Sequence, residues 1–386
     1  MKWRAPGARK KSYKGNYGNF AGHVTVALFL PKPCALARHA GYDLGKRDVT
    51  RLHRMSTPGG LRFMLVTTAK NEAPYFLEWV AYHKLIGFDT ICVFQNDSDD
   101  GTHEILRALS DLGEITYAYN RAKRGAHQVR AYKRAARQQA YLEADWAMAL
   151  DMDEFLTITA PGGTVRDLIS ALPDADQIHL NWRLFSSSGH AEMTDELVIE
   201  RFTRCDPPDQ VVETYTGVKT LFRPAKFIRP GIHKPVPRED STNLVTINGS
   251  GLDKSGFEMR KWRSLDPGKR AFAQVNHYIL RDAASFVLKR WRGSAHQADR
   301  AVGKKYWRTH NRHAFEDLRL PHYAPMVRAE MARMDARSGG ALMAMRRAAI
   351  NHHRDCFRQL RNDPGFAEIY RYCLADIASE TPVAPA

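Results

Sequence analysis

Three carboxylates lie within four residues, directly after a short apolar segment. The segment is Trp146–Leu150, and the acids are Asp151, Asp153 and Glu154. Like charges this close repel one another, and burying them is costly unless a cation neutralises them. Open α/β sheets bind ligands at the carboxyl ends of their strands, and divalent cations prefer hard oxygen ligands. The stretch therefore predicts a metal site that holds a phosphorylated ligand.

The pattern Asp-x-Asp is not specific by itself, because it occurs at 97/99, 151/153 and 174/176. Only the copy at 151/153 follows an uninterrupted apolar strand. On an extended segment, the two carboxylates can approach one cation while the middle side chain points away. Context therefore favours Asp151 and Asp153 as cation ligands, with Glu154 as a neighbouring group.

Polar side chains also follow the first two predicted strands. The first strand is followed by Asn71 and Glu72, and the second by an acidic stretch with Asp97 and Asp99. Acidic groups at such strand ends bind the ribose of nucleotides in α/β folds. Helix capping is the competing interpretation, because Asn, Asp and Ser are good caps. We expect these four residues to form a nucleotide subsite.

Strand and helix patterns alternate between residues 61 and 155. Alternation with short links predicts an α/β fold, with a mostly parallel sheet, helices on both faces and right-handed crossovers. The expected strands are 61–68, 90–95, 115–119 and 146–150, and the expected helices are 72–87, 102–112 and 124–144. Later strands are expected at 177–184, 197–202, 217–223 and 273–279, followed by a helix at 283–292.

The 386 residues divide into three predicted parts. We expect a disordered basic arm at 1–60, an α/β domain at 61–295 with halves 61–155 and 156–295, and a helical C-terminal extension at 296–386. Residues 1–54 contain 12 Lys/Arg and 2 Asp/Glu, so most of the net charge of +16 lies in the arm. Such an arm is a candidate for nonspecific contact with an anionic membrane surface.

The five cysteines are scattered, and none forms a CxxC pair. This argues against a disulfide framework or a zinc cluster and favours a reducing compartment. No apolar run approaches the roughly 20 residues of a membrane helix. We expect a cytoplasmic protein, peripheral at the inner membrane face through its basic arm.

Ordered motifs along the chain carry a family resemblance. They are Lys70-Asn71-Glu72, Glu78-Trp79-x-x-Tyr82-His83-x-x-x-Gly87, Asn96-Asp97-Ser98-x-Asp100-Gly101, Asp151-Met-Asp153-Glu154-Phe155, Asn181-Trp-Arg-Leu-Phe185, Gly217-Val-Lys219, Asn276-His277-Tyr278 and Phe286-x-x-Lys289-x-x-Arg292. As an ordered set they resemble the family-2-like glycosyltransferases of the GT-A (Rossmann-like) fold, in the subgroup that contains the family-92 type enzymes. The resemblance covers about residues 62–295.

The resemblance implies a hexosyltransferase-type enzyme of polysaccharide biosynthesis. It would transfer a sugar from a nucleotide-sugar donor to a hydroxyl of a glycan or lipid-linked glycan, with inversion, helped by Mn²⁺ or Mg²⁺. Asp151 and Asp153 match the family's metal and diphosphate motif, and His277 matches its downstream metal-binding histidine. A core or loop histidine is the competing interpretation of His277.

The family also needs a general base, but the sequence has no clean match to its Glu-Asp pair. Glu192 is the first candidate, and Asp195 and Glu213 are alternatives. Lys219 and Arg223 are candidates to bind phosphate or an acidic acceptor, and a solvated strand face is the competing interpretation. Trp182 is a candidate to stack on a sugar ring, and a buried aromatic is the competing interpretation.

Other functions compete with this one. A nucleotidyltransferase would use the same carboxylates and cation, but usually has a Gly-rich basic loop near the first strand. A glycoside hydrolase would leave the second acidic strand end unexplained. A non-enzymatic protein that binds nucleic acid or anionic surfaces would depend on the basic arm and tolerate loss of Asp151 and Asp153.

Overall fold

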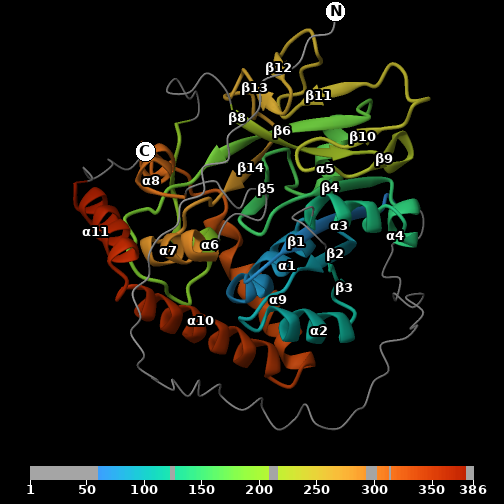
Figure 1. Ribbon diagram of the computed structural model, residues 1–386. Coiled ribbons are helices and arrows are strands. Elements are labelled where there is room, and N and C mark those ends of the chain that lie inside the picture. Colours follow the sequence, from blue (N-terminus) through green and yellow to red (C-terminus); the bar gives the residue numbers. More distant parts are fainter. Residues whose placement is uncertain (1–59, 122–126, 208–215, 293–301, 313, 380–386) are drawn as a thin grey trace, which may run out of the picture. The chain divides into compact units, whose positions relative to one another are not determined.

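The computed structural model describes residues 60–121, 127–207, 216–292, 302–312 and 314–379, and all of them belong to one compact unit. Helices surround a large central sheet (Figure 1). This arrangement confirms the α/β fold class predicted from the sequence. Except for Gly60, the predicted basic arm lies outside the described residues.

The first half of the sheet is parallel, as the alternating pattern predicts. Its strands neighbour one another in the order β3-β2-β1-β4. In the middle of β1, Leu65 is aligned with Ile91 of β2 on one side and with Met148 of β4 on the other. The four strands are β1 (Phe63–Ala69), β2 (Thr90–Gln95), β3 (Thr116–Tyr119) and β4 (Trp146–Ala149).

Helix α1 lies in the interior of the protein. All residues from Phe76 to His83 are buried, because α9 packs against this helix. The long helix predicted at 124–144 is two helices in the described part of that range, since Gln138 adopts an extended ψ of 146° that ends the helical turn. The elements between the parallel strands are η2 (Ala73–Tyr75), α1 (Phe76–Leu85), α2 (Thr102–Asp111), α3 (His127–Ala135) and α4 (Gln139–Leu142).

The second half of the sheet is mixed. Strand β8 is antiparallel to both β4 and β6, whereas β14 is parallel to β6 and antiparallel to β5. The sheet therefore continues in the order β4-β8-β6-β14-β5. Its strands are β5 (Glu154–Ile158), β6 (Gln177–Leu184), β8 (Thr216–Phe222), β14 (Ala273–His277), β11 (Thr246–Asn248), β12 (Met259–Arg260) and β13 (Arg263–Ser264).

The strand predicted at 197–202 is wrong, because this segment forms the short helix α6. The buried carboxylate of Glu78 accepts hydrogen bonds from the backbone N–H groups of Val198 and Ile199, both at 2.9 Å. A carboxylate at the free N–H groups stabilises the start of a helix. The remaining small elements are α5 (Val165–Ala171), α6 (Val198–Arg201), β7 (Arg204–Cys205), η3 (Pro224–Lys226), β9 (Phe227–Arg229), β10 (Val236–Pro237), β15 (Phe315–Glu316) and η4 (Pro321–Tyr323).

The C-terminal helices share the core of the α/β part. Val327, Met331 and Met334 of α9 join the main hydrophobic cluster, and α10 packs against α7 and α2. Figure 1 shows α10 and α11, in red, along the lower left edge of the molecule. Within the described ranges, no helix is long and apolar enough to cross a membrane. These helices are α7 (Ala283–Arg292), α8 (Lys304–His310), α9 (Ala324–Arg337), α10 (Ala341–Leu360) and α11 (Pro364–Ala378).

Candidate active site

The carboxylate cluster and His277 meet because two strands pair. Asp151 and Asp153 follow β4, and β5 begins at Glu154. The antiparallel register of β5 and β14 places His277 opposite Glu154. As a result, Nε2 of His277 lies 3.6 Å from Oδ1 of Asp153. Residues 124 positions apart thus meet near the carboxyl edge of β4, where the sequence predicted a site.

Lys219 of β8 neutralises the other two acids. Its Nζ lies 2.9 Å from Oδ2 of Asp151 and 3.1 Å from Oε2 of Glu154, and its side chain is fully buried. Burial lowers the pKa of Lys219, but the two carboxylates outweigh burial and raise it overall. Burial raises the pKa of Glu154 to about 7, although Lys219 opposes this. Gln128 donates a further hydrogen bond of 2.9 Å to Oδ1 of Asp151.

Asp153 forms an ion pair with a second lysine, Lys289. Nζ of Lys289, from α7, lies 3.1 Å from Oδ2 of Asp153. Burial alone would raise the pKa of Asp153, but the charge of Lys289 and the neighbouring His277 hold it well below its usual range. Asp153 is therefore an ionised carboxylate between two basic side chains, Lys289 and His277.

Glu72 binds two arginines. Its Oε2 lies 2.9 Å from Nη1 of Arg281, and its Oε1 lies 2.6 Å from Nη2 of Arg292. Arg281 has a positive φ of 56°, an uncommon backbone conformation for an arginine. Its guanidinium also lies over the ring of Tyr75, 3.5 Å from the ring centre. Glu72, predicted to bind the donor, is thus buried and engaged in fixing these two arginines.

The other predicted nucleotide-binding residues meet at the ends of β1 and β2. Asn71 donates to Oδ1 of Asp99 at 2.6 Å and accepts from the backbone N–H of Asp99 at 3.0 Å. Asp97 accepts a hydrogen bond from the hydroxyl of Tyr119. Asp97 and Asp99 are exposed, whereas Asn71 lines the same pocket as Asp153. The two strand ends therefore come together as expected, and nucleotide binding there stays a prediction.

Glu192 lies elsewhere. Its side chain accepts a hydrogen bond from the hydroxyl of Tyr370 in α11 and borders a second hollow next to Phe357. It is not among the residues that line the pocket of Asp153. The structure therefore offers no support for Glu192 as general base, and the alternative Glu213 lies outside the described residues.

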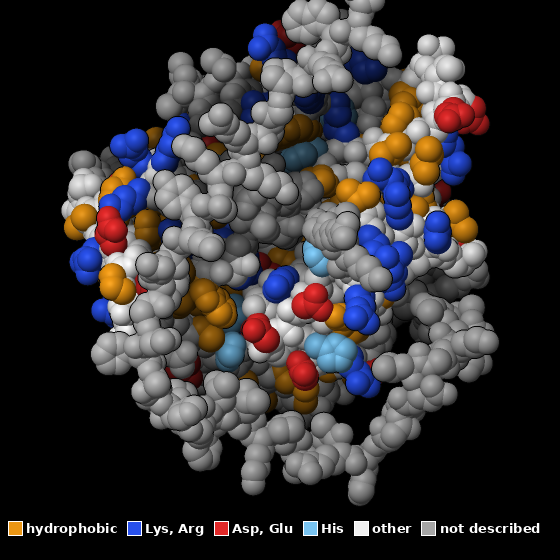
Figure 2. Space-filling model, viewed as in Figure 1, with side chains coloured by type: hydrophobic (Ala, Val, Ile, Leu, Met, Phe, Trp, Pro, Cys, Tyr) orange, Lys and Arg blue, Asp and Glu red, His pale blue; other side chains and the backbone are white. Residues whose placement is uncertain are grey.

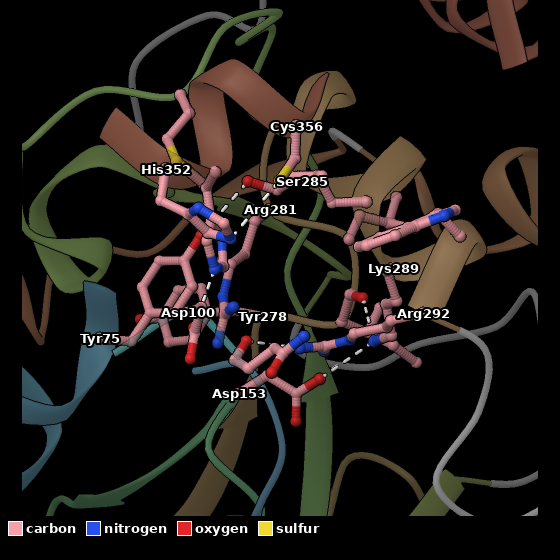
Figure 3. A pocket seen from close by; sticks show the side chains of 17 residues that line it. Tyr75, Asp100, Asp153, Tyr278, Arg281, Ser285, Lys289, Arg292, His352 and Cys356 are labelled. Carbon is pink, nitrogen blue, oxygen red and sulfur yellow. Dashed lines mark hydrogen bonds and ion pairs between the residues drawn. The ribbon is translucent and has the colours of Figure 1, made fainter. Parts of the chain in front are cut away.

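The pocket beside Asp153 is rich in basic groups (Figure 3). Arg281, Lys289 and Arg292 reach toward Asp153, while His352 lies at the other end of the pocket. On the face seen in Figure 2, acidic, basic and histidine side chains gather near the centre. Lys289 and Arg292 belong to a quoted motif, but no local pattern pointed to Arg281 or to α10, which supplies His352, His353 and Cys356.

Residues 67–312 match the family described as Glycosyltransferase family 92. The match spans more than half of the chain. The chain belongs to glycosyltransferase family 92. This membership and the strand order confirm the GT-A type of α/β fold expected from the motifs.

Two plant members of the family are similar to this chain. A glycosyltransferase family 92 protein of Oryza sativa subsp. japonica is 26% identical over 188 residues, which are 47% of this chain and 28% of that protein. One from Arabidopsis thaliana is 28% identical over 227 residues, which are 58% of this chain and 36% of that protein. The chain thus matches about a third of the length of these relatives.

Solved structures match part of this chain at low TM-scores. S. aureus TarS 1-349 in complex with UDP has 15% identity and a TM-score of 0.27, over 43% of this chain and 47% of that chain. Glucosyl-3-phosphoglycerate synthase from Mycobacterium tuberculosis, in complex with Mn²⁺, UDP and glucosyl-3-phosphoglycerate, has 15% identity and a TM-score of 0.22, over 32% of this chain and 45% of that chain.

Around Asp153, the described side chains supply two of the ligands that a divalent cation would need. Among the described residues, no three His, Cys, Asp or Glu converge closely enough to hold a metal alone. Asp153 and His277 do converge, and in the described part of the chain the buried Nδ1 of His277 has no hydrogen-bond partner. Mg²⁺ is usually held by one or two carboxylates together with substrate phosphates and water. Asp151, the third predicted ligand, is held by Lys219 and Gln128.

Proposed function

We propose that this chain is a glycosyltransferase that transfers a sugar from a nucleotide-sugar donor to a hydroxyl group of an acceptor. The family match over residues 67–312 carries the proposal. The pocket supports it, because Asp153 and three Lys or Arg side chains line it at the carboxyl edge of the sheet, where α/β folds bind ligands, and His277 lies next to Asp153. The nucleotidyltransferase and surface-binding alternatives have no comparable support.

Asp153 and His277 are the residues we assign to a divalent cation, Mn²⁺ or Mg²⁺. When bound, such a cation stabilises the negative charge that develops on the leaving nucleoside diphosphate. Lys219 holds Asp151 and Glu154 in place through two ion pairs, and therefore fixes the turn that carries Asp153. Arg281 and Arg292, fixed by Glu72, form the wall of the pocket.

The finer features of the activity rest on the resemblance of the motifs. We assign the nucleotide to the ends of β1 and β2, around Asn71, Asp97 and Asp99. The acceptor is a glycan or lipid-linked glycan, and the transfer proceeds with inversion. We also propose that the protein is cytoplasmic and that its basic arm contacts an anionic membrane surface.

A thermal-shift screen tests the donor class. Nucleoside diphosphates and nucleotide-sugars are added to the full chain with and without MnCl₂. We expect one nucleotide class to raise the melting temperature, with a component that depends on Mn²⁺. Asp153→Asn should remove that component and lower sugar transfer at least about 100-fold.

Asp174→Asn is the matched control, because Asp174 belongs to another Asp-x-Asp copy and is exposed. It should behave as the wild type. No shift with any nucleotide, or unchanged metal-dependent turnover in Asp153→Asn, would overturn the proposed function.

A further inference from the structure

Lys289 forms an ion pair with Asp153, the carboxylate that the proposed function assigns to a cation. Its Nζ lies 3.1 Å from Oδ2 of Asp153 and 2.7 Å from the carbonyl oxygen of Ile279. The side chains of Lys289 and Asp153 are 23% and 18% exposed, so the ion pair borders the pocket and is partly shielded from water. An ammonium group and a divalent cation cannot both approach this carboxylate without strong mutual repulsion.

A cation that binds Asp153 must therefore weaken the ion pair with Lys289. The released ammonium group then needs another anion, because an unpaired charge in a partly buried site is costly. The diphosphate that accompanies the cation supplies that anion. Conversely, when a diphosphate binds without a cation, Lys289 is still paired with Asp153 and is less available to bind it.

Among the three Lys and Arg side chains that line the pocket, Lys289 is the one that forms an ion pair with Asp153. Arg281 is held by Glu72 and by the carbonyl oxygen of Met152 at 3.2 Å. Arg292 is held by Glu72 and by two carbonyl oxygens at the end of β1. Lysine carries a compact charge on a flexible stem with three rotatable donors, which suits a change of partner.

The position of Lys289 on α7 keeps it close to both partners. It lies three residues before Arg292, and residues three apart lie on the same side of a helix. Since Arg292 fastens this side of α7 to the carbonyl oxygens of Lys70 and Asn71, Lys289 stays near Asp153 when the ion pair opens.

Building on the proposed function, we propose that Lys289 is a diphosphate-binding residue, which pairs with Asp153 until a divalent cation and a nucleoside diphosphate bind together. Cation and diphosphate then exchange partners with the ion pair. Asp153 takes the cation, and Lys289 takes the diphosphate. Each ligand removes an obstacle for the other, so each must raise the affinity of the other by the same factor.

Isothermal titration calorimetry on the full chain tests this exchange, with MnCl₂, UDP, GDP and inorganic pyrophosphate as probes. In the wild type, Mn²⁺ and the diphosphate should strengthen each other by about 5–150-fold, the usual range of such coupling. Lys289→Met should bind Mn²⁺ alone several-fold more tightly than the wild type, because Asp153 is free. The same variant should bind diphosphate in the presence of Mn²⁺ about tenfold more weakly.

Asp153→Asn provides the reciprocal test. It frees Lys289, so diphosphate without metal should bind several-fold more tightly than in the wild type, while the effect of Mn²⁺ disappears. Lys289→Arg, which keeps the charge, should retain most of the diphosphate affinity. Lys269→Met, which removes an exposed lysine outside the pocket, should match the wild type.

The outcomes separate the two proposals. If the wild type binds diphosphates with Mn²⁺, but Lys289→Met shifts both affinities in the same direction or neither, the exchange is wrong and the proposed function stands. If the wild type binds no diphosphate with Mn²⁺, both proposals fall. If Lys289→Met does not fold, Asp153→Asn decides alone, because unchanged metal-free affinity for diphosphate would contradict the exchange.

Discussion

Lys219 is a fully buried cation between two carboxylates, and nothing in the local sequence distinguishes it from a lysine on a solvated strand. Lys219 balances the charge of both acids, which matters because Glu154 is also fully buried and Asp151 is largely shielded from water. Replacing one partner of a buried ion pair leaves an uncompensated charge, which is more harmful than removing both charges. Lys219 therefore stabilises the turn that carries Asp153.

We expect Lys219→Met to lower the free energy of unfolding by about 3–5 kcal/mol, because Asp151 and Glu154 lose their counter-ion. Urea unfolding at neutral pH measures the change. The double variant Lys219→Met/Glu154→Gln should recover part of the loss, since one of the two uncompensated charges is gone. A single variant within 1 kcal/mol of the wild type would show that Lys219 contributes little to stability.

The residue types of the site could be predicted from the sequence, but their partners could not. The acidic run at Asp151 and Asp153 and the context of His277 pointed to one edge of the sheet, and the structure brings Asp153 and His277 together there. The ion pairs with Lys219 and Lys289 join strands and helices far apart in the chain, and side-chain periodicity does not encode such pairings. Glu72 was predicted to bind the donor from its place after the first strand, and its two arginine partners, which follow more than 200 residues later, could not be predicted from the local sequence.

At the scale of elements, the parallel half of the sheet was predictable and the mixed half was not. Alternating strands and helices imply parallel neighbours, whereas separate strands after Phe155 leave direction and order open. The register of β5 and β14, which brings His277 to Asp153, is a product of this second half. The strand predicted at 197–202 failed because the remote carboxylate of Glu78 favours a helical turn there.

Packing between β6 and β8 depends on a glycine. A Cβ atom at Gly217 would lie 2.2 Å from Cε3 of Trp182, so the indole ring covers this position closely. The ring of Trp182 in turn contacts His277, with 4.6 Å between ring centres. Because Gly217 has no side chain, the Trp182 ring can lie where it packs against His277, a proposed cation ligand.

We expect Gly217→Ala to lower the free energy of unfolding by about 1–3 kcal/mol, because the indole ring must move. The displaced ring should also weaken Mn²⁺ binding in the presence of diphosphate, measured by calorimetry. Gly303→Ala is the control, because the nearest atom to its added Cβ is a side-chain nitrogen of Arg290 at 3.5 Å. Equal stability of both variants would contradict the packing role of Gly217.

At the scale of the whole molecule, the hydrophobic core extends beyond the residues that match the family. The match ends at residue 312, yet α9 and α10 contribute side chains to the main hydrophobic cluster. Helix α10 also contributes His352, His353 and Cys356 to the pocket that contains Asp153. Nε2 of His353 lies 2.9 Å from Oδ2 of Asp100, and this contact joins α10 to the loop between β2 and α2. The C-terminal helices therefore complete both the fold and the site.

A chain that ends at residue 312 should fail to fold cooperatively. It loses Val327, Met331 and Met334, whose burial contributes about 1.5–3 kcal/mol each, and it exposes the buried helix α1. The combined loss is comparable with the total stability of a typical domain, about 5–15 kcal/mol. Circular dichroism during heating measures the transition, and a chain that ends at residue 379 is the control. A cooperative transition and Mn²⁺-dependent diphosphate binding in the shorter chain would show that residues 67–312 form an independent unit, since both properties require an intact core around Asp153.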